Sequence, residues 1–264
     1  MDLHLDGTIA LVTASTGGIG KEIAATLARE GARVIVNGRT AETVDQAIAD
    51  ISAQVPGAKL ERLVADNGTR EGTQTTADEF PAVDILVNNL GIYGAVDFFD
   101  ITDEAWHQMF EVNVMSGVRL ARYYLPGMLS KGTGRLVFLA SEAAVMPASE
   151  MVHYSASKTM VLGVSRSIAE LTKGSAVTSN AIVAGSTKTD GAVSFIGDLY
   201  PGLSFDEAEA KFMGEGSARS TSLIGRLIKP QEVGDLVAYV SSPLAAAING
   251  SALRIDGGLV RSVF

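Results

Sequence analysis

The sequence predicts an α/β protein, a single doubly wound parallel sheet flanked by helices. Short, continuously apolar runs alternate with longer amphipathic runs along the chain. Such apolar strands are typical of a parallel sheet covered on both faces by its crossover helices. With 264 residues, 47% hydrophobic and 19% charged, the chain is long enough to bury a large core. No linker, low-complexity tract or repeat interrupts it, so we expect one domain over residues 1–264.

Seven short apolar runs are the expected strands, and each is followed by a turn signal or a helical pattern. They lie at residues 8–13, 33–36, 60–65, 83–88, 135–140, 177–183 and 252–255. Helical spacing of apolar residues predicts helices at 20–31, 41–55, 103–130, 154–173 and 230–241. Gly31 is a fitting C-terminal cap for the first of these helices.

Residues 187–226 interrupt this alternation. The segment contains several glycines, Pro201 and a polar, acidic helix-like piece at 205–213. A long irregular insertion in a compact α/β domain is often a lid or a binding loop. We expect a substrate lid here; the alternative is a surface excursion with no role.

Composition excludes several classes of protein. The absence of cysteine excludes disulfide scaffolds and thiolate chemistry, and three histidines without a zinc-binding pattern argue against a metal enzyme. A net charge of −9 without a basic cluster argues against nucleic-acid or anionic-membrane binding. The N-terminus lacks the pattern of a signal peptide, and the apolar runs are too short to span a bilayer. We therefore expect a cytoplasmic protein without a metal.

A glycine-containing loop follows the first predicted strand. It reads Thr13-Ala14-Ser15-Thr16-Gly17-Gly18-Ile19-Gly20 and opens a helix. Amides at a helix N-terminus attract a pyrophosphate, and glycines allow its close approach. Ala14 requires either a turn with negative φ or some backbone strain. The alternative interpretation of the loop is a tight turn before a helix.

The end of the second strand, Asn37-Gly38-Arg39, bears on the choice of dinucleotide. An acidic residue near this point binds the ribose 2′-hydroxyl of NAD, whereas an arginine accommodates the 2′-phosphate of NADP. Gly38 stands where the acid is expected, and Arg39 follows it. This favours NADP(H) over NAD; the alternative is that Arg39 is a solvated turn residue.

Tyr154 and Lys158 lie four positions apart and therefore share one face of a helix. A free tyrosine, with a pKa of about 10, is a poor acid–base catalyst at neutral pH. A nearby lysine ammonium is expected to lower that pKa. Ser141 follows the fifth strand, where its hydroxyl is placed to bind a substrate carbonyl. By itself the pair is also explained by an ordinary amphipathic helix.

Taken together and in this order, these motifs resemble the short-chain dehydrogenase/reductase family over essentially the whole chain. The motifs are the glycine loop, Asn88-Asn89-Leu90-Gly91, Asn113, Ser141 and Tyr154 with Lys158. The resemblance implies a single Rossmann-like domain that transfers a hydride between a nicotinamide and a carbonyl or alcohol. It is nearest to 3-oxoacyl-carrier-protein reductases and to sugar or polyol dehydrogenases of the same family.

The resemblance also implies a role for each matching residue. Tyr154 would exchange the proton with the substrate oxygen, Ser141 would hold that oxygen, and Lys158 would bind the nicotinamide ribose and lower the pKa of Tyr154. Asn113 would hold a water in a proton relay. Asp66 and Asn67 would contact adenine, and Thr187 and Thr189 the nicotinamide carboxamide. The full set of implied cofactor-binding residues is Thr13, Ser15, Thr16, Gly18, Ile19, Gly20, Arg39, Asp66, Asn67, Asn89, Gly91, Tyr154, Lys158, Gly185, Thr187 and Thr189.

Three positions depart from the family pattern without removing a catalytic group. Ala14 and Leu90 replace a glycine and an alanine close to the cofactor, and Ala184 replaces a proline before Gly185. They bear on cofactor affinity rather than on the type of reaction. Glu142 and His153, which neighbour Ser141 and Tyr154, are candidates to face the substrate; the alternative is that both are merely partly exposed.

The leading hypothesis is an NADP(H)-dependent carbonyl reductase or alcohol dehydrogenase acting on a small molecule, in a homo-oligomer (a tetramer or dimer). A reductase acting on an acidic carrier protein needs a basic docking patch, but Arg122, Lys131 and Arg166 are scattered. One alternative is an NAD-linked sugar, polyol or alcohol dehydrogenase. Others are a non-catalytic nucleotide-binding regulator and a structural subunit of a hetero-oligomer, but both conflict with the filled catalytic positions.

Overall fold

Seven parallel strands form one sheet in the order β3-β2-β1-β4-β5-β6-β7. This computed structural model describes residues 1–263. The strands are β1 Ile9–Val12, β2 Arg33–Gly38, β3 Lys59–Val64, β4 Ile85–Asn88, β5 Thr133–Ser141, β6 Ala176–Ala184 and β7 Ala252–Ile255. The predicted doubly wound parallel sheet is confirmed. Its strand order reverses between β1 and β4, the switch point at which such sheets bind ligands beyond their carboxyl ends.

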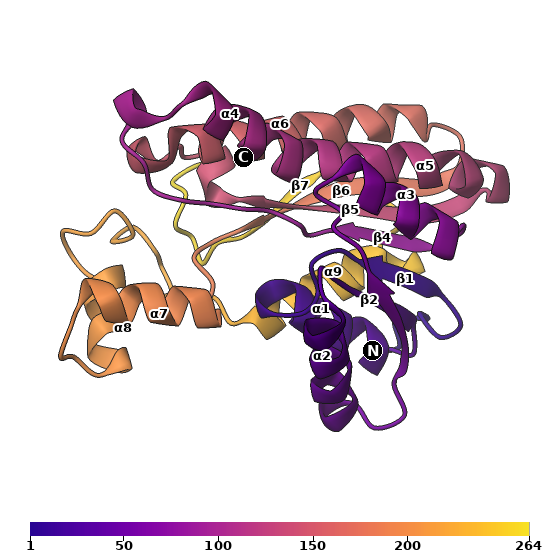
Figure 1. The fold of residues 1–264 in the computed structure, drawn as a ribbon, viewed down its shortest axis with the longest axis horizontal. Coiled ribbons are helices and arrows are strands. Elements are labelled where there is room, and N and C mark those ends of the chain that lie inside the picture. The colour runs from indigo at the N-terminus through magenta and orange to yellow at the C-terminus, as the bar shows by residue number, and fades with distance from the viewer. Residues whose placement is uncertain (264) are drawn as a thin grey trace.

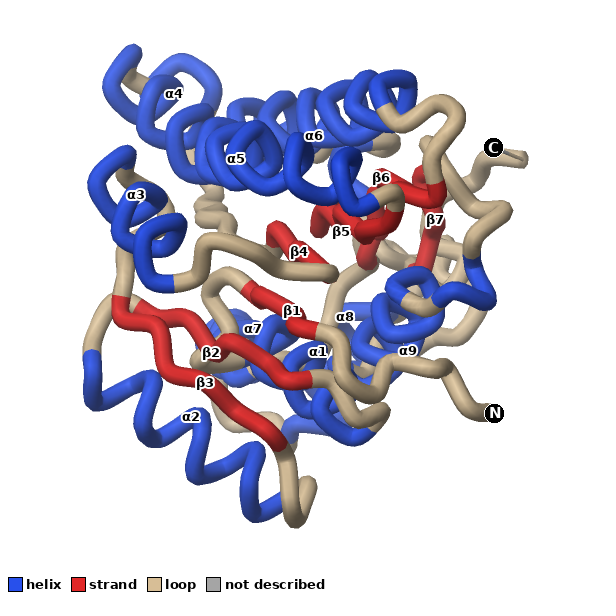
Figure 2. Tube along the Cα trace, turned by 90° about the vertical axis from the view of Figure 1, so that its right-hand side faces the viewer, coloured by secondary structure: helices blue, strands red, loops and turns tan. Residues whose placement is uncertain are grey.

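Helices cover both faces of the sheet (Figure 1). They are α1 Gly18–Arg29, α2 Ala41–Gln54, α3 Arg70–Glu79, α4 Asp103–Phe110, α5 Ser116–Lys131, α6 Val152–Leu171, α7 Asp190–Leu199, α8 Phe205–Met213 and α9 Pro230–Ser241. Figure 2 shows α4, α5 and α6 on one side of the strands and α1, α2 and α9 on the other.

Alternation along the strands divides the core into two layers. In β1, Ala10 and Val12 pack in the cluster that contains α1, α2 and α9, whereas Leu11 packs in the cluster that contains α5 and α6. Successive side chains of a strand point to opposite faces, so a continuous apolar run supplies both layers.

Three elements differ from the sequence expectation. The helix expected at 103–130 is divided by a π-helical turn at Glu111–Met115. Helix α3 was not expected, because its sequence is polar and lacks an apolar stripe. The segment 187–226 is less irregular than expected, since it contains α7 as well as α8.

Helices α7 and α8 project from the sheet on the side where β6 ends (Figure 1). They have a small apolar cluster of their own, made of Ile196, Ala208, Phe212, Met213 and Leu227. The segment is therefore a packed helical unit attached beside the carboxyl ends of the strands.

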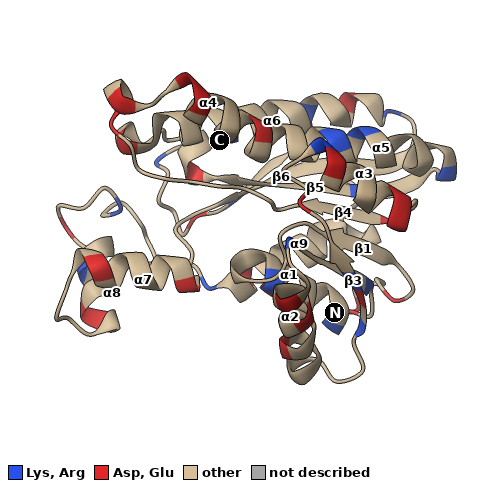
Figure 3. Cartoon of the chain, viewed as in Figure 1, with Lys and Arg blue, Asp and Glu red and all other residues tan. Residues whose placement is uncertain are grey.

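Basic and acidic residues are interspersed along the chain, and acidic ones gather on α2, α4 and α8 (Figure 3). Within residues 1–263, no helix combines the length and apolar character needed to cross a bilayer.

Helices α1 and α9 pack closely at Gly234, which fixes the helix that follows the glycine loop. A Cβ at Gly234 would lie 2.7 Å from Thr26 Oγ1 and 3.2 Å from the carbonyl oxygen of Glu22. The contact leaves no room for a side chain on α9 at this position.

We therefore predict that Gly234→Ala lowers the free energy of unfolding by about 1–3 kcal/mol, because overpacking outweighs the better helix propensity of alanine. The matched control is Gly127→Ala in α5, where a Cβ meets nothing within 4 Å. This control is expected to gain about 0.5–1 kcal/mol. Urea unfolding of both variants checks the prediction, and equal effects of the two changes would contradict it.

Candidate active site

Side chains from β2 and β4 hold the loop between β1 and α1 in place. The Asn89 amide donates to the carbonyl oxygens of Thr13, at 2.9 Å, and Ala14, at 3.1 Å. Thr13 Oγ1 accepts the backbone N–H groups of Asn89 and Leu90. From β2, Asn37 Oδ1 accepts the N–H of Ala14 at 3.1 Å. We call this set of contacts the asparagine clamp.

The asparagine clamp accompanies a strained residue. Ala14 has φ of +51°, so the strain alternative holds rather than a turn with negative φ. A non-glycine residue in this region costs on the order of 1–2 kcal/mol. The fold tolerates this cost because the N–H and C=O of Ala14 both bind clamp side chains.

The first turn of α1 is open to an anion. Its N-cap, Gly17, has no side-chain cap, and the turn contains no acidic residue. By contrast, threonines at positions 40, 69, 102 and 189 cap α2, α3, α4 and α7 with their side chains. At Gly20 a Cβ would lie 2.4 Å from Asn89 Nδ2, so glycine is required there. Free amides, the helix dipole and a close backbone approach fit a pyrophosphate.

Several loop residues expected to bind cofactor turn their side chains inward. Ser15 is fully buried and donates to Val12 O at 2.8 Å while accepting the N–H of Asn37. Ile19 packs against the core. The backbone N–H of Ser15 also donates to Asn37 O at 2.9 Å, so both the side chain and the amide of Ser15 are engaged within the protein.

At the end of β2, the structure has no space for an acidic side chain at position 38. A Cβ on Gly38 would lie 2.4 Å from Thr16 Cγ2 and 2.9 Å from Val44 Cγ2. Arg39 follows and is exposed. The guanidinium of Arg39 therefore borders this edge of the site, and an acidic side chain does not fit at position 38.

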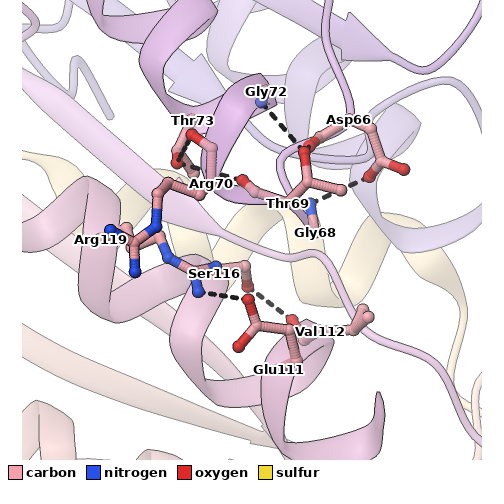
Figure 4. A network of polar contacts seen from close by, with 10 residues as sticks. All are labelled: Asp66, Gly68, Thr69, Arg70, Gly72, Thr73, Glu111, Val112, Ser116 and Arg119. Atoms are coloured by element: carbon pink, nitrogen blue, oxygen red, sulfur yellow. Dashed lines mark hydrogen bonds and ion pairs between the residues drawn. The ribbon is translucent and has the colours of Figure 1, made fainter.

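After β3, Asp66, Gly68 and Thr69 lie in a tight turn that leads into α3 (Figure 4). The Asp66 carboxylate accepts the N–H of Gly68 at 3.0 Å. Asn67 is buried, donates to Asn37 Oδ1 at 3.1 Å and accepts the Thr76 hydroxyl at 2.8 Å. The Asn67 side chain thus supports the clamp from behind.

Figure 4 also shows the Glu111–Arg119 ion pair, which braces the π-helical turn against α5.

Tyr154, Lys158 and Ser141 meet where β5 ends and α6 begins. Lys158 is buried, its Nζ donates to Leu139 O at 2.8 Å, and it lies 5.8 Å from the centroid of the Tyr154 ring. Burial lowers the pKa of Lys158 to about 8. Burial raises the pKa of Tyr154 to about 12, assisted by the charge of Glu142 and opposed by a hydrogen bond to Ser141.

The expectation that Lys158 lowers the pKa of Tyr154 stays a prediction, because burial is the largest influence on that pKa in this structure. Desolvation of the phenolate is the largest effect on Tyr154, and the ammonium of Lys158 points to the carbonyl of Leu139. Tyr154 is consequently a protonated phenol at neutral pH.

Asn113 lies in the π-helical turn and ties the site together. Its amide donates to Ile92 O and to Ser157 Oγ, both at 2.9 Å, and its Oδ1 accepts the N–H of Ile92 at 2.7 Å. π-Helical turns occur frequently at functional sites. The Asn113 side chain thus holds the segment that follows β4 against α6. Gly91 lies within this arrangement, where a Cβ would be 3.1 Å from Lys158 Nζ.

The segment after β6 returns to the glycine loop. Gly185 passes so close to β7 that a Cβ would lie 2.8 Å from Asp256 Cα. Thr187 Oγ1 donates to Gly185 O at 2.8 Å, and Thr189 caps α7. The Thr189 methyl carbon would be 3.2 Å from a Cβ on Gly18. The start of α7 therefore lies beside the N-terminus of α1.

Sequence reasoning left Glu142 open and missed its partners. Ser141 Oγ donates to Glu142 Oε2 at 2.6 Å, and Ser186 Oγ donates to the other carboxylate oxygen at 3.4 Å. Arg219 Nε in turn donates to Ser186 Oγ at 2.8 Å. Ser186 and Arg219 carry no recognisable motif, so only the fold brings them together. His153 points elsewhere: it is buried edge-on against Trp106, at 6.0 Å between ring centroids.

Among residues 1–263, no three His, Asp or Glu side chains are grouped to hold a metal ion. The polar groups of the site are instead amides and hydroxyls, together with the phenol of Tyr154, the ammonium of Lys158, the guanidinium of Arg39 and the carboxylates of Asp66 and Glu142. Such a set suits a dinucleotide and a small oxygenated substrate.

Comparison with known proteins gives consistent matches. The family model described as short chain dehydrogenase matches residues 8–196. The chain is 55% identical to the uncharacterized oxidoreductase YvaG of Bacillus subtilis over the full length of both proteins. It is 34% identical to the 3-oxoacyl-acyl-carrier-protein reductase FabG of Escherichia coli, covering 97% of this chain and 99% of that protein.

Solved structures agree with these matches. L-sorbose reductase from Gluconobacter frateurii, complexed with NADPH and L-sorbose, superposes with a TM-score of 0.92 at 28% identity, covering all of both chains. An actinorhodin polyketide ketoreductase variant with NADPH superposes with a TM-score of 0.85 at 31% identity, covering 97% of this chain and 98% of that one.

The burial of Lys158 gives a prediction for stability. Because its pKa is about 8 in the folded protein and 10.5 as its ordinary value, the unfolded chain binds more protons between these pH values. Stability contributed by this group therefore rises with pH through that window, and the cost of the buried charge is full below pH 8.

We predict that Lys158→Met increases the free energy of unfolding at pH 7 by about 1–3 kcal/mol and flattens its rise between pH 8 and 10.5. Lys173→Met, at an exposed lysine after α6, is the control and is expected to change neither. Urea unfolding across this pH range is the measurement. A Lys158→Met variant that is less stable than the wild type at pH 7 contradicts the account.

Proposed function

This chain belongs to the short-chain dehydrogenase family and is an oxidoreductase of alcohol or carbonyl substrates, and on that premise we propose that it reduces a small carbonyl compound with NADPH, using Tyr154 as the acid–base group. The observation that carries this proposal is a convergence at one edge of the sheet. The open N-terminus of α1, Tyr154 and the buried Lys158 and Ser141 all lie at the carboxyl ends of the strands.

The proposed cofactor site uses the backbone of the glycine loop and the first turn of α1 for the pyrophosphate. Thr13 and Asn89 shape that loop through the asparagine clamp, and Gly91 allows close approach to Lys158. Asp66 and Asn67 border the adenine end, and Gly185, Thr187 and Thr189 border the nicotinamide end. When bound, the nicotinamide supplies or accepts the hydride.

Arg39 and Gly38 support NADP(H) as the preferred cofactor. An exposed guanidinium pairs with a 2′-phosphate through two N–H donors. The crowding at Gly38 excludes the acidic side chain that favours NAD. The two named relatives solved with NADPH are in keeping with this choice.

Three side chains carry the proposed chemistry. Tyr154, a protonated phenol at neutral pH, donates its proton to the substrate oxygen during reduction. Ser141 donates a hydrogen bond to the same oxygen and polarises the carbonyl. Lys158 adds positive charge behind Tyr154, which stabilises the phenolate as the proton leaves. Asn113 positions α6 and the strand end rather than contacting substrate.

We further propose that residues 1–264 act as one cofactor-binding and catalytic domain, with residues 187–226 as its substrate lid. The lid proposal is supported by the contact of Thr189 with the glycine loop and by the separate apolar cluster of α7 and α8. A packed unit of this kind moves as a body about short connections.

The proposed substrate is a small molecule rather than an acidic carrier protein. Basic residues are interspersed with acidic ones, and acidic residues gather on α4 and α8 (Figure 3). A homo-oligomer is supported by an apolar groove between α5 and α6, lined among others by Leu125, Met160, Gly163 and Leu171. A cytoplasmic location stays a prediction from the sequence.

The cofactor proposal predicts that Arg39→Ala weakens NADPH binding about 10- to 100-fold and leaves NADH binding within about twofold, because a charge-assisted contact is lost. Arg33→Ala, at the opposite end of β2, is the matched control and is expected to change neither. Fluorescence titration of each variant with both dinucleotides is the measurement. Equal loss for both dinucleotides, or tighter NADH binding by the wild type, contradicts NADP(H) preference.

The acid–base proposal predicts that Tyr154→Phe lowers kcat/KM for carbonyl reduction about 10²–10⁴-fold while NADPH binding is kept. Phenylalanine preserves the ring and removes only the proton donor. Tyr123→Phe, which loses only a hydrogen bond to Ala77 O, is the control and retains activity. Steady-state kinetics with NADPH decides between these outcomes, and a fully active Tyr154→Phe would refute the role.

A further inference from the structure

Glu142 holds a carboxylate directly beside the proposed reaction centre. Its Oε2 lies 2.6 Å from Ser141 Oγ, and the carboxylate raises the pKa of Tyr154 through its charge. Burial raises the pKa of Glu142 itself, so the ionised form is held there at a cost. A costly carboxylate in a site lined by reacting groups points to a role in recognition.

The direction of the hydrogen bonds defines what Glu142 does to Ser141. An ionised carboxylate only accepts, so the hydroxyl of Ser141 is the donor. A hydroxyl has one proton, and while that proton is given to Glu142 it is not given to a substrate carbonyl. Ser141 can therefore polarise a substrate carbonyl only when another group donates a hydrogen bond to Glu142 and releases the Ser141 proton.

The remaining contacts of Glu142 leave Oε2 free to accept a hydrogen bond from the substrate in place of the one from Ser141. Its Oε1 is approached by Ser186 Oγ at 3.4 Å, and Ser186 is itself held by Arg219 at 2.8 Å. The Arg219 guanidinium also lies 4.2 Å from the centre of the Phe212 ring, within the helical unit at 187–226. The carboxylate is thus steadied from the lid through Ser186, without a direct ion pair that would occupy Oε2.

We propose that Glu142 accepts a hydrogen bond from a hydroxyl on the carbon next to the substrate carbonyl, which makes α-hydroxy ketones, and the vicinal diols formed from them, the preferred substrates. The inference rests on the proposed function and specifies its substrate class. Oxygens on neighbouring carbons lie about one hydrogen-bond length apart, as Ser141 Oγ and Glu142 Oε2 do. One oxygen therefore meets Ser141 while the other meets Glu142.

Binding then exchanges one hydrogen bond for two. The substrate hydroxyl donates to Glu142, the Ser141 hydroxyl is released, and it donates to the substrate carbonyl. A ketone without this hydroxyl has no hydrogen-bond donor. Ser141 then either keeps donating to Glu142, or donates to the ketone and leaves the half-buried carboxylate without a partner. Sites built to bind a substrate hydroxyl discriminate strongly against the analogue that lacks it.

The test compares 1-hydroxybutan-2-one with butan-2-one, a pair that differs by one hydroxyl, using NADPH as the donor. We expect wild-type kcat/KM to favour the hydroxy ketone about 100-fold or more. In Glu142→Gln the ratio is expected to fall at least about tenfold, with kcat/KM for butan-2-one rising, because a side-chain amide donates to Ser141 and frees its proton. Glu142→Ala is expected to lower the ratio as well.

Controls separate recognition from structure. Glu79→Gln, at an exposed residue at the end of α3, is expected to leave the ratio unchanged. Ser186→Ala is expected to raise KM for the hydroxy ketone more than for butan-2-one, as a positioning residue should. If Glu142 had only a structural role, its variants would change kcat/KM for both substrates by the same factor and would lower the melting temperature of the protein.

A wild-type ratio near one, or a ratio that Glu142→Ala leaves unchanged in a folded, NADPH-binding variant, overturns the inference while the proposed function stands. Reduction of plain ketones without reduction of any α-hydroxy ketone overturns it too. Absence of NADPH-dependent reduction of every carbonyl in a panel of both classes contradicts the proposed function itself, and the inference with it.

Discussion

The asparagine clamp is the constraint on which the rest of the site depends. Asn37 from β2 and Asn89 from β4 hold the backbone of the glycine loop from two sides, and Asn67 supports Asn37 from behind. These contacts hold Ala14 at positive φ just before the first turn of α1, whose N-cap has no side-chain partner. The helix therefore presents free amides at the strand switch point, and the proposed catalytic residues on β5 and α6 lie at the same edge.

The sheet was predictable because its signal is hydrophobic and local. Residues such as Leu11 and Ile35 are apolar because the central strands are buried on both faces, and right-handed crossovers favour a doubly wound sheet. Helix α3 was not predicted because its buried face consists mainly of small and polar residues rather than large apolar ones. Thr76, for example, is buried and its hydroxyl donates to the carbonyl oxygen of Gly72 one helical turn earlier. The helical packing of α7 and α8 depends on residues far apart in sequence, including Leu227.

The sequence predicted which residues form the candidate site better than it predicted the contacts between them. The order of Ser141, Tyr154 and Lys158 along the chain is a sequence property, but the pKa of Tyr154 depends on burial that only the fold creates. In the same way, the sequence does not tell that Ser15 turns inward. The link from Glu142 through Ser186 to Arg219 joins the segments that follow β5 and β6 to the helical segment 187–226, and no spacing rule connects these residues.

The central claim is that this edge of the sheet brings a carbonyl carbon to a nicotinamide, with a buried phenol supplying the proton. The most direct test follows the hydride itself: 1-hydroxybutan-2-one is reduced with NADPH carrying deuterium at both positions of nicotinamide C4, and the product is examined by mass spectrometry. The account predicts a single deuterium on the carbon that was the carbonyl. A product without deuterium at that carbon, or no alcohol product from this or any other carbonyl, would contradict it.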